Sequence, residues 1–119
     1  MRVTIGETWL YKHGGEEPNG MWNKDAYFRD NFSFWSPLDE QFLRLLLGIA
    51  RKENISVIAP YFSQYFFSYY TFGDVESSKL PQWPGSVPAS WDKALESIRD
   101  HRLSSTGKAM SGLLDNNGR

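Results

Sequence analysis

The pattern of apolar residues predicts a long helix over residues 37–53. The apolar positions repeat at helical spacing and share one face. They are Leu38, Phe42, Leu45, Leu46 and Ile49. At the start of the segment, Ser36 is expected to be the N-cap and Pro37 the first helical residue, and Asp39 is an acid in the first turn that can reach back to a free amide.

Two segments rich in β-branched residues flank this helix and predict strands. Residues 2–11 alternate loosely between apolar and polar side chains and contain no proline. Residues 55–59 read Ile-Ser-Val-Ile-Ala, and Pro60 ends the run. Asn54, between the helix and the second strand, suits the left-handed conformation that commonly ends a helix. We therefore expect strand, helix and strand to follow one another here.

The segment from residue 61 to residue 72 is dominated by aromatic side chains, and two structures fit it. As a strand, successive rings point to opposite faces. As a helix, Tyr65 and Tyr69 fall on one stripe with their neighbours. Because aromatic side chains favour strands and lose rotamer freedom in helices, we predict a strand over residues 64–72.

The last third of the chain contains a proline-rich segment followed by helical patterns. Residues 73–90 include three prolines and little periodicity, which predicts an ordered surface loop. Ser90 is expected to cap a helix with Trp91 and Leu95 on its apolar face. A short helical stripe follows over residues 109–114, and residues 115–119 are expected to be a frayed tail.

The order of these elements predicts a single globular domain, residues 1–119, of the α+β class. A chain of 119 residues corresponds to one domain. We expect a small, mostly antiparallel sheet of about three strands, covered by three to four helices.

Composition excludes several classes of function. Lys and Arg number 13 against 14 Asp and Glu, so the chain is not a polybasic nucleic-acid binder. It has no cysteine, which removes disulfides, thiol catalysis and Cys-based zinc sites. No apolar run approaches the ~20 residues of a membrane span, and no signal peptide is evident. We expect a cytoplasmic protein without a metal, cofactor or membrane partner.

Candidate catalytic residues are few, because the chain has two histidines. His13 lies near Glu16 and Glu17, and a small hydrolase or nuclease using this set is one alternative function. His101 lies near the end of a predicted helix, where a partial positive charge is favourable. The sequence contains no nucleophile elbow and no phosphate-binding glycine loop. We therefore assign no catalytic residue.

Aromatic residues make up 16% of the chain, and such side chains are enriched where proteins bind one another. A domain of this size is expected to leave some of the rings outside its core as a contact surface. Acids beside these rings would complement a basic partner surface. The predicted binding residues are Tyr65, Tyr69, Tyr70, Trp83, Asp74 and Glu76.

The sequence hypothesis is therefore a non-enzymatic protein-binding module that blocks a partner by stoichiometric occlusion. Immunity proteins and phage-encoded inhibitors have this profile, so the expected partner is a protein such as a toxin or a defence component; self-association into a homodimer is another use of the surface. A third hypothesis is a single-strand nucleic-acid binder that stacks bases on the aromatic strand. One lysine against two acids over residues 54–90 counts against it.

Overall fold

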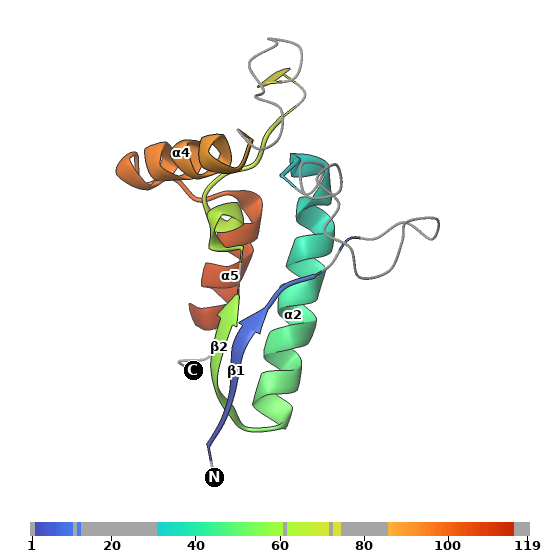
Figure 1. Cartoon of the computed structure of the whole chain (residues 1–119). Helices are drawn as coiled ribbons and strands as arrows, with labels where there is room; N and C mark the ends of the chain where they lie inside the picture. The colour runs from blue at the N-terminus through green and yellow to red at the C-terminus, as the bar shows by residue number, and fades with distance from the viewer. Residues whose placement is uncertain are drawn as a thin grey trace, which may run out of the picture.

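Two parallel strands and the helix that connects them form the centre of the fold. The computed structural model describes residues 2–10, 12, 31–60, 62–71, 73–74 and 86–115. Strand β1 is Val3–Thr8, helix α2 is Ser36–Lys52 and strand β2 is Ile55–Pro60. In Figure 1 the strands lie side by side in front of the helical layer, with α2 along one side. The predicted helix and both flanking strands are confirmed to within a few residues at their ends.

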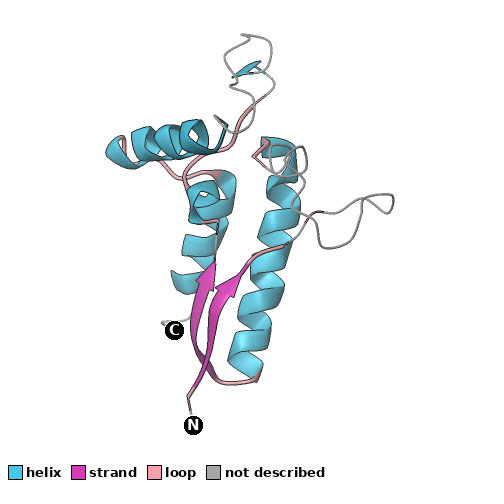
Figure 2. Ribbon diagram, in the orientation of Figure 1, coloured by secondary structure: helices cyan, strands magenta, loops and turns pink. Residues whose placement is uncertain are grey.

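The sheet is parallel and two-stranded, so the α+β class is confirmed but the expected antiparallel, three-stranded sheet is wrong. Val3 pairs with Ile55 and Ile5 with Ile58, with irregularities in the register between the pairs. Both arrows point the same way in Figure 2. A helix between two neighbouring strands returns the chain to the end where it started, which makes the strands parallel. The third strand predicted from the sequence was residues 64–72 of the aromatic segment, whose described part has a different structure.

The described residues of the aromatic segment, 62–71, do not form a strand. Residues Ser63–Phe66 form a 3₁₀ helix, η2, and one isolated parallel bridge joins Tyr70 to Phe32. The rings of Tyr65 and Tyr69 stack with centroids 5.2 Å apart and planes 7° from parallel. In a strand, residues four apart are separated by roughly 13 Å, so this stack requires a turn. Local turn formation and ring burial therefore override the strand preference of the aromatic residues.

Two more helices complete the described fold. Helix α4 is Ser86–Arg99 and helix α5 is Ser105–Asp115. Figure 1 shows α5 beside α2 and α4 across the end of the helical layer. None of the described helices combines the length and apolar character that crossing a bilayer requires. The hydrophobic core comes from α2, the aromatic segment and α4. Its buried members are Leu43, Leu46, Leu47, Ala50, Tyr65, Tyr69, Tyr70 and Ala94.

Several helix ends differ from the expected ones. Trp35, which ends a short 3₁₀ helix η1 (Ser33–Trp35), is the N-cap of α2 without a side-chain bond, so Ser36 is not the cap. Helix α4 starts at Ser86, which places Ser90 inside the helix and shortens the predicted 73–90 loop. Asn54 has φ 53°, which confirms the left-handed turn after α2.

Some predicted elements lie outside the described residues. Residues 75–85 of the predicted loop are not described, and neither are residues 116–119 of the predicted tail. Asp115 itself is the last residue of α5. The expectations for these segments therefore stay predictions.

A glycine allows α5 to begin directly against the aromatic segment. The Ser104 hydroxyl accepts a bond from the Gly107 amide at 3.1 Å, and the Ser104 amide donates to the Phe66 carbonyl at 3.0 Å. A Cβ on Gly107 would overlap that carbonyl oxygen and would lie 2.9 Å from the carbonyl carbon. Only a residue without a side chain fits this contact.

We predict that Gly107→Ala lowers the free energy of unfolding by about 1–3 kcal/mol, because backbone must move to admit the methyl group. Urea denaturation of the two proteins measures the difference. Gly112→Ala is the matched control, since nothing lies within 4 Å of that position on the same helix. There the better helix propensity of alanine should stabilise by about 0.5–1 kcal/mol. Equal effects of the two substitutions would contradict the packing argument.

Candidate functional site

The six residues predicted to bind a partner do not form one exposed patch in the described structure. Tyr65, Tyr69 and Tyr70 are 1%, 8% and 5% exposed, so these rings belong to the core. Asp74 is half-buried and its carboxylate lies 2.6 Å from the Lys93 ammonium. Trp83 and Glu76 lie outside the described residues. The expectation that the tyrosines form an exposed face is therefore wrong.

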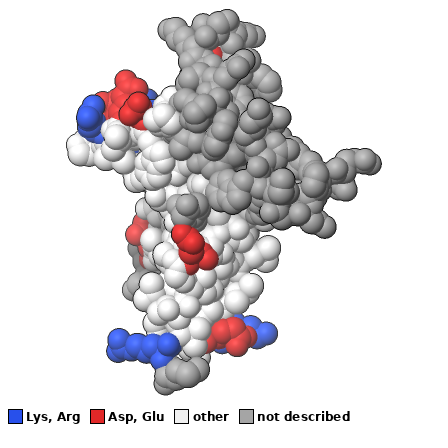
Figure 3. All heavy atoms as spheres, in the orientation of Figure 1, with Lys and Arg blue, Asp and Glu red and all other residues white. Residues whose placement is uncertain are grey.

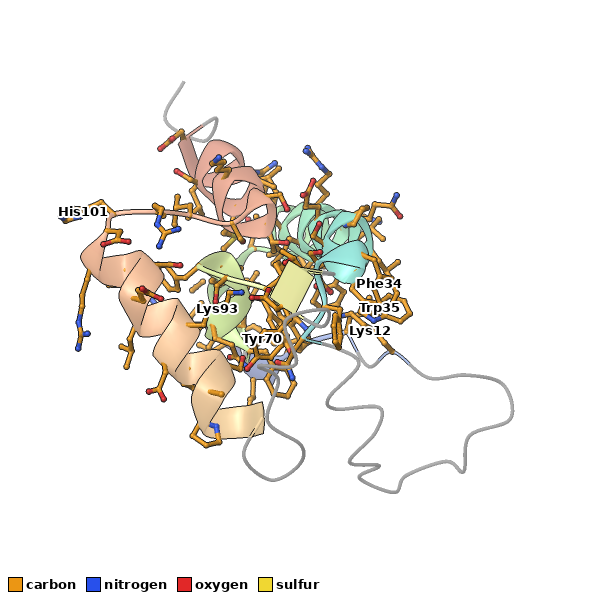
Figure 4. All side chains as sticks on the ribbon, turned by 90° about the horizontal axis from the view of Figure 1, so that it is seen from above. Lys12, Phe34, Trp35, Tyr70, Lys93 and His101 are labelled. Carbon is orange, nitrogen blue, oxygen red and sulfur yellow. The ribbon has the colours of Figure 1, made fainter. Side chains whose placement is uncertain are left out.

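Instead, the tyrosines surround a buried ion pair. Lys12 Nζ lies 2.8 Å from Asp39 Oδ1, and both side chains are fully buried. The same ammonium lies 5.7 Å from the ring centroid of Trp35 and 5.3 Å from that of Tyr65. Figure 4 shows Lys12 next to Trp35. Ring faces attract a cation, so they help to offset the loss of water around the ammonium.

The second oxygen of Asp39 extends this pair into a hydrogen-bonded chain. The Tyr69 hydroxyl donates to Asp39 Oδ2 at 2.7 Å and lies 2.8 Å from Thr106 Oγ1. Because Tyr69 gives its only proton to Asp39, Thr106 donates to the Tyr69 oxygen. The chain therefore joins the segment after β1, α2, the aromatic segment and α5.

Burial controls the protonation of this network. Burial raises the pKa of Asp39, while the neighbouring Lys12 and the hydrogen bond from Tyr69 act in the opposite direction. Burial and the nearby Asp39 carboxylate raise the pKa of the Tyr69 phenol far above its usual range. Tyr69 therefore keeps its proton and acts as a donor.

A second buried polar contact joins the aromatic segment to α4. Asn31 Oδ1 accepts hydrogen bonds from the Tyr65 hydroxyl at 3.2 Å and from the Ser90 hydroxyl at 3.1 Å. The backbone of Asn31 also accepts from the Tyr70 amide at 2.8 Å. Ser90 therefore anchors α4 to the core and does not cap it.

Asp74 organises the turn that follows the aromatic segment. Its carboxylate accepts bonds from the Thr71 amide at 2.6 Å and the Thr71 hydroxyl at 2.9 Å, besides its ion pair with Lys93. Partial burial alone would raise the pKa of Asp74, but these bonds outweigh it and lower the pKa below the usual value. Lys93 also lies 5.3 Å from the ring centroid of Tyr70, toward which it reaches in Figure 4.

These polar clusters connect elements of the fold and stabilise it. The Lys12–Asp39 pair is sealed from solvent, so a substrate cannot reach it. The described residues contain no group of three or more His, Asp or Glu side chains that could hold a metal ion. His101 is exposed with φ 54° and lies at the far end of α4 in Figure 4. His13, Glu16 and Glu17 lie outside the described residues, so the hydrolase alternative stays a hypothesis.

The surface features that stand out are apolar side chains on α2 and α4. On α2, Leu38, Leu45 and Ile49 are 39%, 68% and 53% exposed. Their spacing of seven and four residues places them on one line of the helix, and Phe34, just before the helix, is 53% exposed. We call these four residues the α2 ribbon. In Figure 3, which shows one face, the described surface below the grey region is mostly uncharged apart from acidic groups in its middle and at its left edge and the charged groups at the bottom.

Comparison with known proteins adds no assignment: no family model, no curated protein and no solved structure matches this chain. Its described geometry must therefore carry any proposal about function. That geometry contains two buried polar clusters and two exposed apolar rows.

Sequence reasoning missed the roles of Lys12, Asp39 and Thr106. From the sequence, Asp39 is expected only to stabilise the start of a helix as a first-turn acid. A signal for its true role is present, since Asp39 shares a helical face with Leu43, Leu46 and Ala50, all of which are buried. An acid on a buried face needs a cation or a donor. The pattern does not indicate that Lys12 supplies the cation.

We predict that Asp39→Ala lowers the free energy of unfolding by about 3–5 kcal/mol, because it leaves the Lys12 ammonium buried without its counter-charge. Urea denaturation measures the loss. The double variant Lys12→Met/Asp39→Ala removes both charges and should lose less than the two single losses combined. Strict additivity of the two single effects would show that the pair is not coupled.

We predict that Asp74 contributes stability at neutral pH that is lost in acid. Its pKa in the folded protein lies below the ordinary 3.8, so near that pH the unfolded chain binds more protons than the folded one. The difference in unfolding free energy between the wild type and Asp74→Asn should be largest above about pH 5 and should shrink as the pH falls below about 4. Urea denaturation across this range measures it. Asp115→Asn, at the exposed end of α5, is the control, and an equal pH dependence there would refute the assignment.

Proposed function

We propose that the protein is a non-enzymatic protein-binding module that blocks a partner protein by occupying its surface in equimolar ratio. The contact surface in this proposal is the α2 ribbon, formed by Phe34, Leu38, Leu45 and Ile49. A toxin or a defence component remains the expected kind of partner.

The exposure of Leu45 and Ile49 is the observation that carries this proposal. They are 68% and 53% exposed, although α2 buries a different face built from Leu43, Leu46 and Ala50. A helix that only packs on its own core needs one apolar face. A second apolar row that faces water lowers solubility and is typical of a surface that another protein covers.

Two further observations support binding over the alternatives. The buried charged residues of the described core, Lys12 and Asp39, are paired with each other. The rings of Tyr65, Tyr69 and Tyr70 are buried, so the segment expected to stack single-stranded bases has those faces covered. Nucleic-acid binding is therefore less well supported than protein binding.

The proposal places the partner contact on different residues from those expected from the sequence. Asp74 is expected from the sequence to attract a basic partner, but Lys93 neutralises its charge within the chain, and Glu76 lies outside the described residues. We therefore expect the surface of the partner that contacts the α2 ribbon to be apolar and not basic. Leucine and isoleucine side chains gain most from burial against such a surface.

We predict that Leu45→Asp/Ile49→Asp weakens partner binding by about 30-fold or more, because two buried anchors are worth at least roughly 2 kcal/mol. Affinity capture from the source cells with the wild-type chain and the double variant, followed by mass spectrometry, identifies the proteins whose capture depends on the ribbon. Titration calorimetry with such a protein then measures affinity and stoichiometry.

Ser111→Asp is the matched control, since Ser111 is exposed on α5 and gains the same acidic group. Circular dichroism must show equal helix content in all three proteins. The proposal fails if the wild type and the double variant capture the same proteins in equal amounts.

A further inference from the structure

Helix α4 buries small side chains and exposes large ones. The buried side chains, at most 6% exposed, are those of Ser90, Ala94 and Ser97. The exposed ones, between 40% and 46%, are those of Trp91, Leu95 and Ile98. A helix that serves only to cover a core turns its large apolar residues inward. We call the exposed row the α4 ribbon.

Two opposite charges border the α4 ribbon on the same side. Asp92 and Arg99 are seven residues apart, which is about two helical turns, or roughly 10.5 Å along the axis. Both are exposed, and neither has an ion-pair partner in the part of the chain that the structure describes. Lys93, on the same helix, is already paired with Asp74. The exposed charges of α4 without an ion-pair partner among the described residues are thus Asp92 near one end of the ribbon, Arg99 near the other and Glu96 between them.

We propose that the α4 ribbon binds the α4 ribbon of a second copy of this chain, with the helices antiparallel about a two-fold axis at Leu95. In this arrangement Leu95 packs against Leu95 of the second copy, and each Trp91 lies beside the other copy's Ile98. Each Asp92 then faces the other copy's Arg99. The proposal uses a different helix from the α2 ribbon and does not depend on it.

The order of the charges selects this partner and this direction. A two-fold interface is self-complementary, so a residue that meets a second residue across it is met by that same residue in return. Antiparallel helices satisfy this condition with two Asp92–Arg99 pairs. Parallel helices related by a two-fold axis would place each residue at the same height as its own copy and on the opposite flank of the contact, so no Asp92 would meet an Arg99. An unrelated partner would require no such self-complementary order.

The first experiment measures association by sedimentation equilibrium between about 10 µM and 1 mM, the range expected for an interface one helix wide. The wild type should show a reversible monomer–dimer equilibrium. Asp92→Arg and Arg99→Asp, which each create two like-charge contacts, should each weaken it by about tenfold. The combined variant Asp92→Arg/Arg99→Asp should restore the wild-type dissociation constant. Asp115→Arg, with the same charge change on α5, should have no effect.

The second experiment uses the absence of cysteine in the chain. Leu95→Cys introduces a single thiol at the proposed two-fold axis, where the two copies of residue 95 meet, so mild oxidation should give a disulfide-linked dimer. Lys108→Cys, exposed on α5, is the control and should remain mostly monomeric under the same conditions.

The proposal is overturned if the wild type stays monomeric up to about 1 mM, because the α4 ribbons would then be too weak an interface to hold two copies together. It is also overturned if the combined charge exchange fails to restore dimerisation lost in the single variants, or if Leu95→Cys and Lys108→Cys cross-link equally. Circular dichroism of each variant separates loss of dimer from loss of fold.

Discussion

The buried ion pair between Lys12 and Asp39 is the constraint on which the arrangement of the described elements depends. A charged side chain that is buried away from water must stay next to an opposite charge, so the Lys12–Asp39 pair fixes the segment after β1 to α2. The Tyr69 and Thr106 hydroxyls continue the contact from Asp39 to α5. A sheet of two strands is only marginally stable by itself. Here it packs on the helical layer, which the hydrogen-bonded chain from Lys12 to Thr106 holds together.

This arrangement places the tyrosines of the aromatic segment inside and leaves mostly aliphatic side chains on the outer faces of α2 and α4. The stacked rings of Tyr65 and Tyr69 line the ion pair, where they exclude water and offer a ring face and a hydroxyl donor. Leu45 on α2 and Leu95 on α4 then face solvent. In this protein, the surface suited to association is therefore made by helix rows and not by the aromatic segment.

The positions of α2 and of the two strands, which neighbouring residues set, were predictable from the sequence, while the starts of α2 and α4, expected at Ser36 and Ser90, and the contacts between distant residues were not. The helix α2, the β-branched strands and the left-handed Asn54 are local, and the structure confirms them. The apolar face expected on α2 is mostly not the buried one, because Leu38, Leu45 and Ile49 are exposed. Asp39 bonds to Tyr69, which is 30 positions away, and Tyr69 contacts Thr106, 37 positions further on. The local pattern of the aromatic segment fits a helical stripe with Tyr65 and Tyr69 as well as a strand, and the strand preference of aromatic residues favoured the wrong alternative because the distant contacts were not known.

The two exposed ribbons lie on helices that run in different directions, with α4 across the end of the layer that contains α2 (Figure 1). Helix α4 packs on the rest of the described protein mainly through η2, and not through α2. Pairing through α4 therefore leaves the α2 ribbon of each copy uncovered. A dimer built in this way presents two equivalent apolar surfaces, and a partner with two matching sites would bind it more tightly than it binds one copy, because the second contact forms within the same complex.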